Sequence, residues 1–208
     1  MTAIQLLRNA TSPLKIVIIE PRANLGGGIA YSTEVAGHLL NVPAGQMSAF
    51  ADEPDHFLRW LRKNSDRNYG PQSFASRSLY GDYLADTLYD CEGEASRLAS
   101  IDHYRTRATR VEVQDETVRI TLRNDIAIVA DRLVLALGHQ ASANRLEQYG
   151  VPTVPAWSKN ALANLDPQAS VLLVGTGLTA VDTALALDEQ GHRGPIYAIS
   201  RHGKWPQV

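Results

Sequence analysis

The stretch VLLVGTGLTAVDTALALDEQGHRGPIYAIS, residues 171–200, decides the fold. Its pattern predicts a buried apolar strand, a glycine turn, a helix and a second strand. Gly175, Gly177 and Ala180 form G-x-G-x-x-A where the strand passes into the helix. The first glycine permits a sharp turn, the second lets a pyrophosphate approach the backbone, and the small third residue lets helix and strand pack closely. The stretch therefore predicts half of a dinucleotide-binding unit, whose phosphate contacts would be Gly175, Gly177, Leu178, Thr179 and Ala180.

The residues at the end of the second strand would determine whether the site prefers NAD or NADPH. A site that prefers NAD usually has a carboxylate there for the ribose 2′-hydroxyl, whereas this strand ends in Ser200, Arg201 and His202. An arginine can pair with a 2′-phosphate through two hydrogen bonds, so we expect NADPH, with Ser200 and Arg201 as contacts. Two alternatives stay open. The glycine turn could be structural only, and Arg201 and His202 could be ordinary solvated loop residues.

A similar unit begins the sequence. Residues 2–10 favour a helix, and LKIVIIE (14–20) is a continuous apolar strand of the kind found in parallel sheets covered on both faces. The strand ends in Glu20, where a Rossmann-type site places its ribose-binding carboxylate. From Gly175 to Ser200 the second unit spans 25 positions. The same spacing counted back from Glu20 puts a first glycine about five residues before Met1, so we expect the first phosphate loop to lie outside this sequence.

Between these units the pattern changes several times. Residues 21–50 are rich in glycine and proline and predict a long ordered loop, which is uncommon unless functional. The further expected elements are helices near 53–63 and 78–90, three antiparallel strands of period two within 106–130, and a buried strand over 131–139 that is stopped by Gly138.

This order of elements, with an antiparallel insert before a final strand ending in glycine, is typical of FAD-binding folds. The resemblance becomes specific in EPRANLGGGIAYST (20–33), HLLNVPAGQMSAF (38–50), RSLYGDYL (77–84), LVLALGH (133–139) and VLLVGTGLTAVDTAL (171–185). With these stretches the sequence resembles a bacterial family of FAD/NAD(P)-binding proteins, whose members include a FAD-dependent urate hydroxylase.

The resemblance implies a set of FAD contacts. Glu20 would bind the adenosine ribose, with Pro21 and Arg22 beside it. The loop of Gly26, Gly27, Gly28 and Tyr31 would pass the pyrophosphate and the ribityl chain. The remaining implied contacts are Asn41 and Met47 near the isoalloxazine, Ala108 near the adenine and Gly138 on the far side of the cofactor. From the residues alone, the three glycines could instead be a flexible turn. Trp60, Tyr80 and Tyr83 have helical spacing and favour core positions over cofactor clamps.

The predicted fold class is α/β. We expect a Rossmann-like FAD-binding unit with a β-meander insert over 1–150 and a partial second Rossmann-like NAD(P)H-binding unit over 151–208. The implied function is a FAD-dependent oxidoreductase that uses NADPH on a small-molecule substrate, with monooxygenase character. Because the flavin supplies such chemistry, no catalytic residue can be named. The alternative is a non-catalytic nucleotide-binding or interaction module, or an inactive fragment.

Composition narrows the partners. The 20 basic and 22 acidic residues form no sustained block, which argues against binding to nucleic acid or to an anionic membrane. The single cysteine, Cys91, has no partner for a disulfide, so we expect a cytoplasmic protein. His38, His56, His103 and His139 share no ligand spacing, and we expect no metal.

Overall fold

A computed structural model describes residues 1–95, 97–138, 150, 153–154 and 162–206. Contacts divide the chain into two compact units. The first contains Met1–Ser32 and Asn41–Gly138, and the second contains Thr33–Leu40 and His139–Val208. The predicted boundary at residue 150 stays a prediction, since most residues around it lie outside the described ranges.

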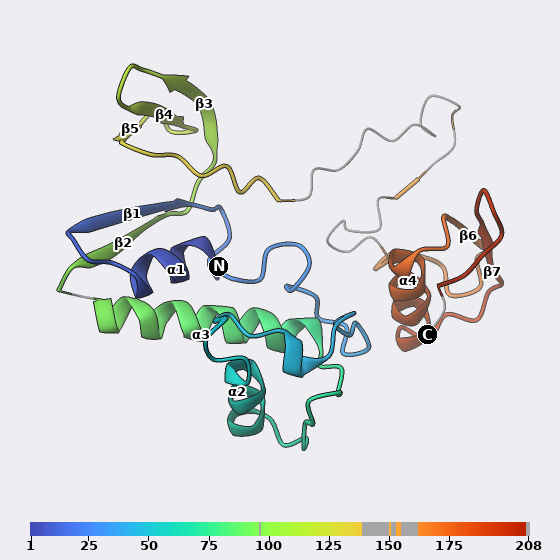
Figure 1. Ribbon diagram of the computed structural model, residues 1–208. Helices are drawn as coiled ribbons and strands as arrows, with labels where there is room; N and C mark the ends of the chain where they lie inside the picture. Colours follow the sequence, from blue (N-terminus) through green and yellow to red (C-terminus); the bar gives the residue numbers. More distant parts are fainter. Residues whose placement is uncertain (96, 139–149, 151–152, 155–161, 207–208) are drawn as a thin grey trace. The chain divides into compact units, whose positions relative to one another are not determined.

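A parallel pair of strands lies at the start of the first unit. β1 (Leu14–Ile19) pairs with β2 (Ala99–Tyr104) in a register that runs from Leu14 opposite Ala99 to Ile19 opposite Tyr104. The helices α1 (Thr2–Arg8) and α3 (Arg77–Ala95) lie together along one side of this pair (Figure 1). The predicted helix and strand at residues 2–20 are confirmed, as is the helix near 78–90, which extends further than predicted.

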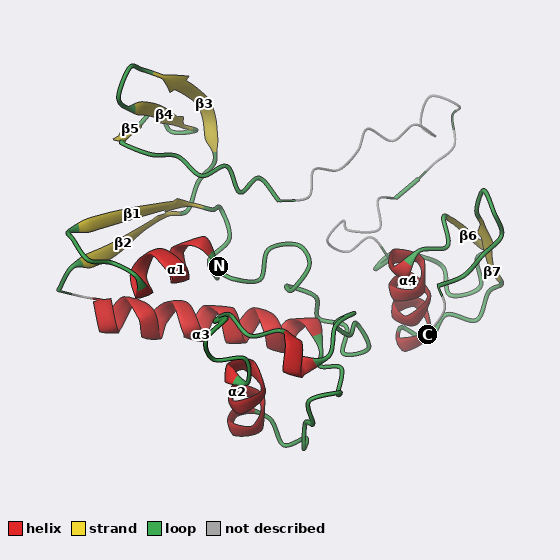
Figure 2. Cartoon of the chain, viewed as in Figure 1, coloured by secondary structure: helices red, strands yellow, loops and turns green. Residues whose placement is uncertain are grey.

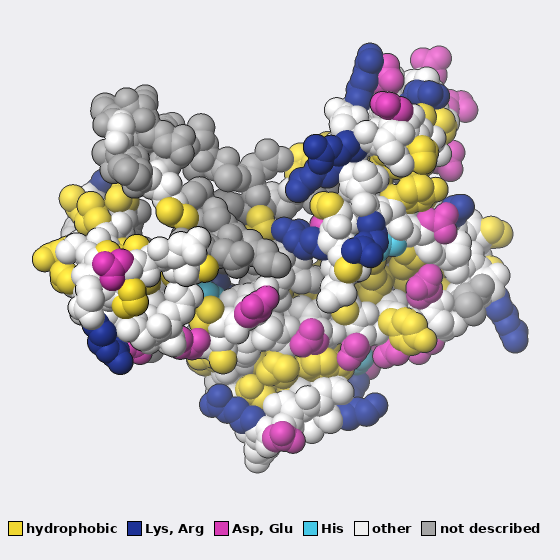
Figure 3. Space-filling model, turned by 180° about the vertical axis from the view of Figure 1, so that it is seen from behind, with side chains coloured by type: hydrophobic (Ala, Val, Ile, Leu, Met, Phe, Trp, Pro, Cys, Tyr) yellow, Lys and Arg dark blue, Asp and Glu magenta, His cyan; other side chains and the backbone are white. Residues whose placement is uncertain are grey.

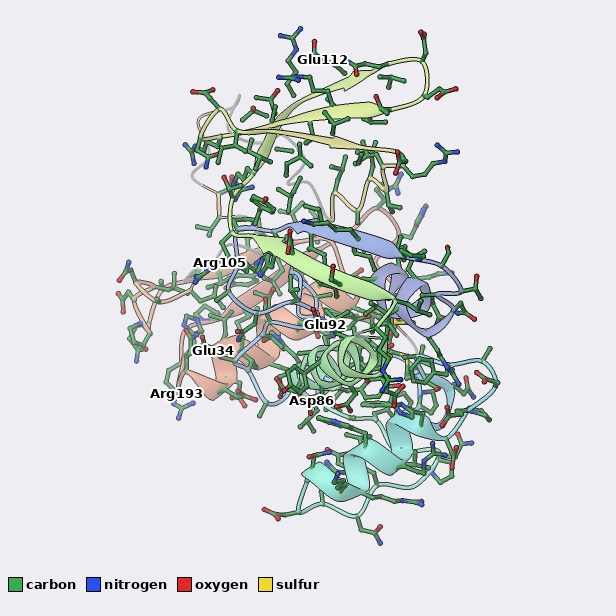
Figure 4. All side chains as sticks on the ribbon, turned by 90° about the vertical axis from the view of Figure 1, so that its left-hand side faces the viewer. Glu34, Asp86, Glu92, Arg105, Glu112 and Arg193 are labelled. Atoms are coloured by element: carbon green, nitrogen blue, oxygen red, sulfur yellow. The ribbon has the colours of Figure 1, made fainter. Side chains whose placement is uncertain are left out.

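Aromatic side chains fill the space between α3 and α2 (His56–Asn64). The ring of Phe57 lies 5.0 Å from that of Tyr80 and 4.8 Å from that of Tyr83, and neither Phe57 nor Tyr83 has exposed surface. Trp60 packs at the edge of this cluster, where its Nε1–H donates to Asp86 on α3 (2.9 Å; Asp86 is labelled in Figure 4). The prediction of core positions is therefore confirmed for Tyr80 and Tyr83, whereas Trp60 is only half-buried.

Tyr83 also holds the segment that contains the short 3-10 helix η1 (Ala44–Gln46). Its hydroxyl accepts the Ala49 N–H at 2.9 Å and lies 2.8 Å from Nδ1 of His56. The Gln5 amide on α1 donates to the Ala49 carbonyl at 2.7 Å, and the guanidinium of Arg8 lies 4.0 Å from the ring centre of Phe50. Side chains from three helices thus hold residues 49 and 50 in place.

Folding should depend on pH through His56. Burial lowers the pKa of His56, against the opposing charge of Glu53 and with smaller lowering effects of Arg59 and Arg8. Because the folded pKa lies below the unfolded value of about 6.5, its contribution is complete above that pH and is lost as the pH falls. The free energy of unfolding, measured by urea titration between about pH 7 and pH 5, should fall less steeply for His56→Gln than for the parent. Parallel curves for the two proteins would contradict this assignment.

A three-stranded meander follows β2. β3 (Ala108–Val113), β4 (Val118–Leu122) and β5 (Ala127–Ala130) pair in antiparallel order, as Figure 2 shows. Ile120 and Leu122 are buried on one face of the central strand, whereas Arg119, next to Ile120, is exposed. The three strands predicted within 106–130 are confirmed.

The strand predicted over 131–139 is wrong for the described residues 131–138, which have no strand partner. Val134, Leu135 and Leu137 are 59–68% exposed instead of buried. The physical reason is that an apolar run indicates burial but supplies no neighbour, and a strand exists only through hydrogen bonds to one. The last residue of the predicted strand, His139, lies outside the described residues.

In the second unit, the parallel strands β6 (Val171–Val174) and β7 (Ile196–Ile199) are joined by α4 (Leu178–Glu189). This confirms the predicted order of strand, helix and strand. Residues 33–40 pack against α4 through two hydrogen bonds. The Gly37 N–H donates to Glu189 (3.0 Å), and Nε2 of His38 lies 2.9 Å from the Asp182 carbonyl oxygen. The chain therefore has a Rossmann-like α/β fold.

Two general features of the described residues bear on partners. None of their helices is both long and apolar enough to cross a bilayer. Acidic and basic side chains are interspersed on the face that Figure 3 shows.

Candidate dinucleotide-binding sites

The glycine turn after β6 separates two different needs for glycine. Gly175 has a φ of +111°, a left-handed conformation that side chains rarely adopt, and its N–H donates to the Ile199 carbonyl at 2.7 Å. Gly177, the N-cap of α4, has an ordinary φ of −76°, and a Cβ atom there would meet no atom within 4 Å. Since neither backbone nor packing requires glycine at Gly177, its missing side chain leaves free space directly before the helix.

The start of α4 suits an anion. Its first turn carries no acidic side chain, and the backbone N–H groups at a helix N-terminus, here those of Leu178 and Thr179, favour negative charge. Ala180 is buried, and its N–H donates to the Gly177 carbonyl at 2.9 Å. Thr176 is also buried and donates its hydroxyl to the Lys204 carbonyl at 2.5 Å. These contacts hold the turn in one conformation.

The end of β7 brings Ser200 close in the fold to this turn, because Gly175 bonds to the residue immediately before it. The Ser200 hydroxyl is buried and has no hydrogen-bond partner among the residues that the structure describes. A buried polar atom without a partner is costly, and a ligand hydroxyl or phosphate could supply that partner. Arg201 lies in the next turn, exposed and without an ion pair in the described part of the chain.

The end of β1 holds Glu20 at the carboxyl edge of the parallel pair. Its N–H donates to the Tyr104 carbonyl at 3.1 Å, and its own carbonyl lies 2.8 Å from Nε2 of His103. One carboxylate oxygen accepts the Arg22 N–H at 2.9 Å, whereas the nearest guanidinium nitrogen is 3.4 Å from both oxygens. The side chain is 29% exposed, so it keeps acceptor capacity for a hydroxyl donor. Pro21 beside it is exposed.

The glycine loop that follows is packed on α3. Gly26 and Gly28 have φ of +99° and +53°. The Tyr31 N–H donates to the Gly27 carbonyl at 2.8 Å, and the Tyr31 ring meets that of Tyr80 edge-on, with 4.9 Å between centroids. These contacts give the loop a defined conformation on the helix.

Four other predicted contacts lie on other segments of the chain. Asn41 is exposed, Met47 ends η1, Ala108 is the exposed first residue of β3, and Gly138 has a φ of +67° after the unpaired residues 131–137. No hydrogen bond or ion pair among the described residues joins any of them to the Glu20 carboxylate. They stay predictions.

Four residues that make these contacts were missed at the level of sequence: His103, Tyr104, His38 and Gly81. His103 and the Tyr104 carbonyl come from β2, where ASIDHY gave no strand signal, and Arg105 follows at the end of that strand (Figure 4). His38 and the glycine Gly81 in α3 also went unassigned. Only Gly81 carried a usable signal, since glycine is a poor residue for a helix interior.

Two titratable groups of the core, Tyr80 and Cys91, are poor candidates for chemistry. Burial raises the pKa of Tyr80 to about 12, with smaller contributions from Tyr31 and Tyr83. Burial also raises the pKa of the Cys91 thiol. Both groups are therefore protonated at neutral pH. Within the described ranges, no three His, Cys, Asp or Glu side chains lie close enough together to hold a metal.

Comparison with known proteins gives a family and a fold. No curated protein matches the sequence. Among solved structures, a flavin-containing monooxygenase from Stenotrophomonas maltophilia matches 97% of this chain at 19% identity and a TM-score of 0.52. A double mutant of a flavin monooxygenase from the same organism matches 92% of the chain at 17% identity, with a TM-score of 0.48. The chain spans 54% and 58% of these two proteins.

The first of these similarities supports the fold alone. The family model described as FAD-NAD(P)-binding matches residues 1–140, which is well over half of the chain. It includes β1, Glu20, the glycine loop, α3 and the meander. The protein therefore belongs to the FAD-NAD(P)-binding family.

Proposed function

We propose that the second unit binds NADPH at the turn between β6 and α4. The observation that carries this proposal is the free space beside Gly177, where a pyrophosphate could lie. The fold itself does not require glycine at this position. The helix start lies beside it. The buried Ser200 hydroxyl, which has no partner among the described residues, lies where the adenosine ribose is expected. The Arg201 guanidinium would then face the 2′-phosphate.

We further propose that the first unit binds FAD along the carboxyl edge of β1. Membership of the FAD-NAD(P)-binding family supports this assignment. Glu20 would accept the hydroxyl groups of the adenosine ribose, while the Arg22 backbone N–H keeps the carboxylate oriented. The loop from Gly26 to Tyr31 would border the rest of the cofactor.

Together these assignments suggest an NADPH-dependent flavin oxidoreductase of monooxygenase type. FAD, when bound, would supply the redox chemistry, taking a hydride from NADPH and passing the electrons to molecular oxygen. The chain's own residues would bind and orient the two dinucleotides. The fold shared with a flavin-containing monooxygenase agrees with this proposal. A flavin absorption spectrum and an assay of NADPH oxidation test it, because a non-catalytic binding module would bind without turnover.

Changing Arg201 to Asp tests the coenzyme assignment. We expect NADPH affinity to fall about tenfold to a hundredfold and NADH affinity to rise, because the new carboxylate repels the phosphate and accepts from the ribose. Titration of each variant with NADPH and with NADH measures the ratio of the two affinities. Arg193→Asp is the matched control, since Arg193, labelled in Figure 4, is an exposed arginine that precedes β7 in the sequence, whereas Arg201 follows it. Equal coenzyme ratios in Arg201→Asp and the control would exclude this role for Arg201.

A further inference from the structure

We propose that Gly81 is a positioning residue, whose missing side chain forms the seat that holds the Gly26–Tyr31 loop against α3. Gly81 is the fifth residue of α3 and is buried. A Cβ atom there would lie 2.6 Å from the Tyr31 carbonyl oxygen and 3.4 Å from the Gly27 Cα. The first distance is far below van der Waals contact, and the opposing atom is backbone. The loop and the helix can therefore meet this closely only if residue 81 is glycine.

The contact is equally tight from the side of the loop. A Cβ atom at Gly26 would lie 3.0 Å from the Gly81 carbonyl oxygen and 3.1 Å from the backbone nitrogen of Ala85. Gly26 also has a φ of +99°, so it needs to be glycine for its conformation as well. Two glycines, 55 positions apart in the sequence, thus allow one backbone to rest on the other.

The neighbouring side chains complete the seat. Tyr80, adjacent to Gly81, meets the Tyr31 ring edge-on and is itself held by Phe57. Helix propensity offers no alternative explanation for Gly81, because glycine destabilises a helix interior relative to alanine. The same helix contains Gly93, at which a Cβ atom would meet nothing within 4 Å. Packing against the loop is what distinguishes Gly81.

The role in cofactor binding rests on the proposed function. If the loop borders FAD, a side chain at residue 81 displaces the loop from the cofactor without touching the cofactor itself. We expect Gly81→Ala to weaken FAD binding about tenfold to a hundredfold, by the cost typical of overpacking. Gly93→Ala, the matched control, should bind FAD like the parent and be at least as stable.

The experiment uses the full 208-residue chain in two measurements. Hydrogen exchange of the protein without FAD reports the loop alone, and Gly81→Ala should exchange the Tyr31 amide about tenfold faster than Gly93→Ala. Gly26→Ala alters the loop and leaves the helix sequence intact, and it should speed the exchange of the Tyr31 amide in the same way. It replaces Gly81→Ala in the test if that variant folds poorly. Titration with FAD then gives the change in affinity.

Each outcome decides a separate point. If the Tyr31 amide exchanges at the parent rate in folded Gly81→Ala and Gly26→Ala, Gly81 does not hold the loop against α3. If the Tyr31 amide of Gly81→Ala exchanges faster but the variant binds FAD as tightly as Gly93→Ala, the position of the loop does not matter for cofactor binding. A parent chain that binds no FAD would contradict the proposed function, while the exchange data would still decide whether Gly81 seats the loop.

Discussion

A Gly177→Asp variant is expected to lose coenzyme affinity by about a hundredfold or more and to fold as stably as the parent protein. Gly177 is the N-cap of α4, with a backbone conformation open to any residue and free space around its Cβ position. Aspartate is among the best N-cap residues, so the helix itself should gain stability. A carboxylate about 4 Å from a phosphate repels it by about 4 kcal/mol at an effective dielectric constant of 20, whereas a hundredfold loss needs about 2.7 kcal/mol.

The control for Gly177→Asp is Gly177→Asn, which has nearly the same shape and no charge. Asparagine also caps helices well, so both variants should keep the parent melting temperature or exceed it. Calorimetric titration with NADPH and NADH should show a smaller loss for Asn than for Asp, and the difference measures the electrostatic part. Parent-like affinity in both variants would show that no pyrophosphate approaches Gly177.

Replacing Phe57 by alanine should lower the free energy of unfolding by about 3–5 kcal/mol. Phe57 has no exposed surface and touches the rings of Trp60, Tyr80 and Tyr83. A cavity in this position removes contacts from α2 and α3 at once. Since domains are typically stable by about 5–15 kcal/mol, the variant should lose a large part of its stability.

Phe74→Ala is the matched control for Phe57→Ala, because the Phe74 side chain is 43% exposed. The same atoms are deleted there, and a change within about 1 kcal/mol is expected. Chemical denaturation followed by circular dichroism compares the two. Similar losses in both variants would mean that the aromatic cluster contributes little to the stability of the first unit.

The elements that the sequence identified share a property. Their patterns repeat within a few residues, as in the apolar run Ile16–Ile19, the alternation of the meander and the glycine spacing before α4. Local patterns of this kind report which face of a segment is buried. They do not report which other segment covers it. This explains why 131–138 was wrongly predicted as a strand and why β2, with polar Ser100 and Asp102, was missed.

The candidate sites divide in the same way. Glu20 and the Gly175–Ala180 turn could be named because each lies at a strand end that a short motif marks. Other contacts join residues that are 50 or more positions apart: those of the Tyr104 carbonyl, of His38 and of Gly81. No local sequence pattern predicts them. The one exception is Gly81, because a glycine within a helix is unfavourable and therefore indicates a close contact.

By itself, the sequence determined the α/β class and the strand-helix-strand order of residues 171–200. Only the tertiary structure decided that β1 pairs with β2, that Gly177 is free of packing constraints and that Gly81 is not. The physical reason is that hydrophobic periodicity and turn preferences act between near neighbours in the chain, whereas pairing and steric contact depend on which distant segments meet.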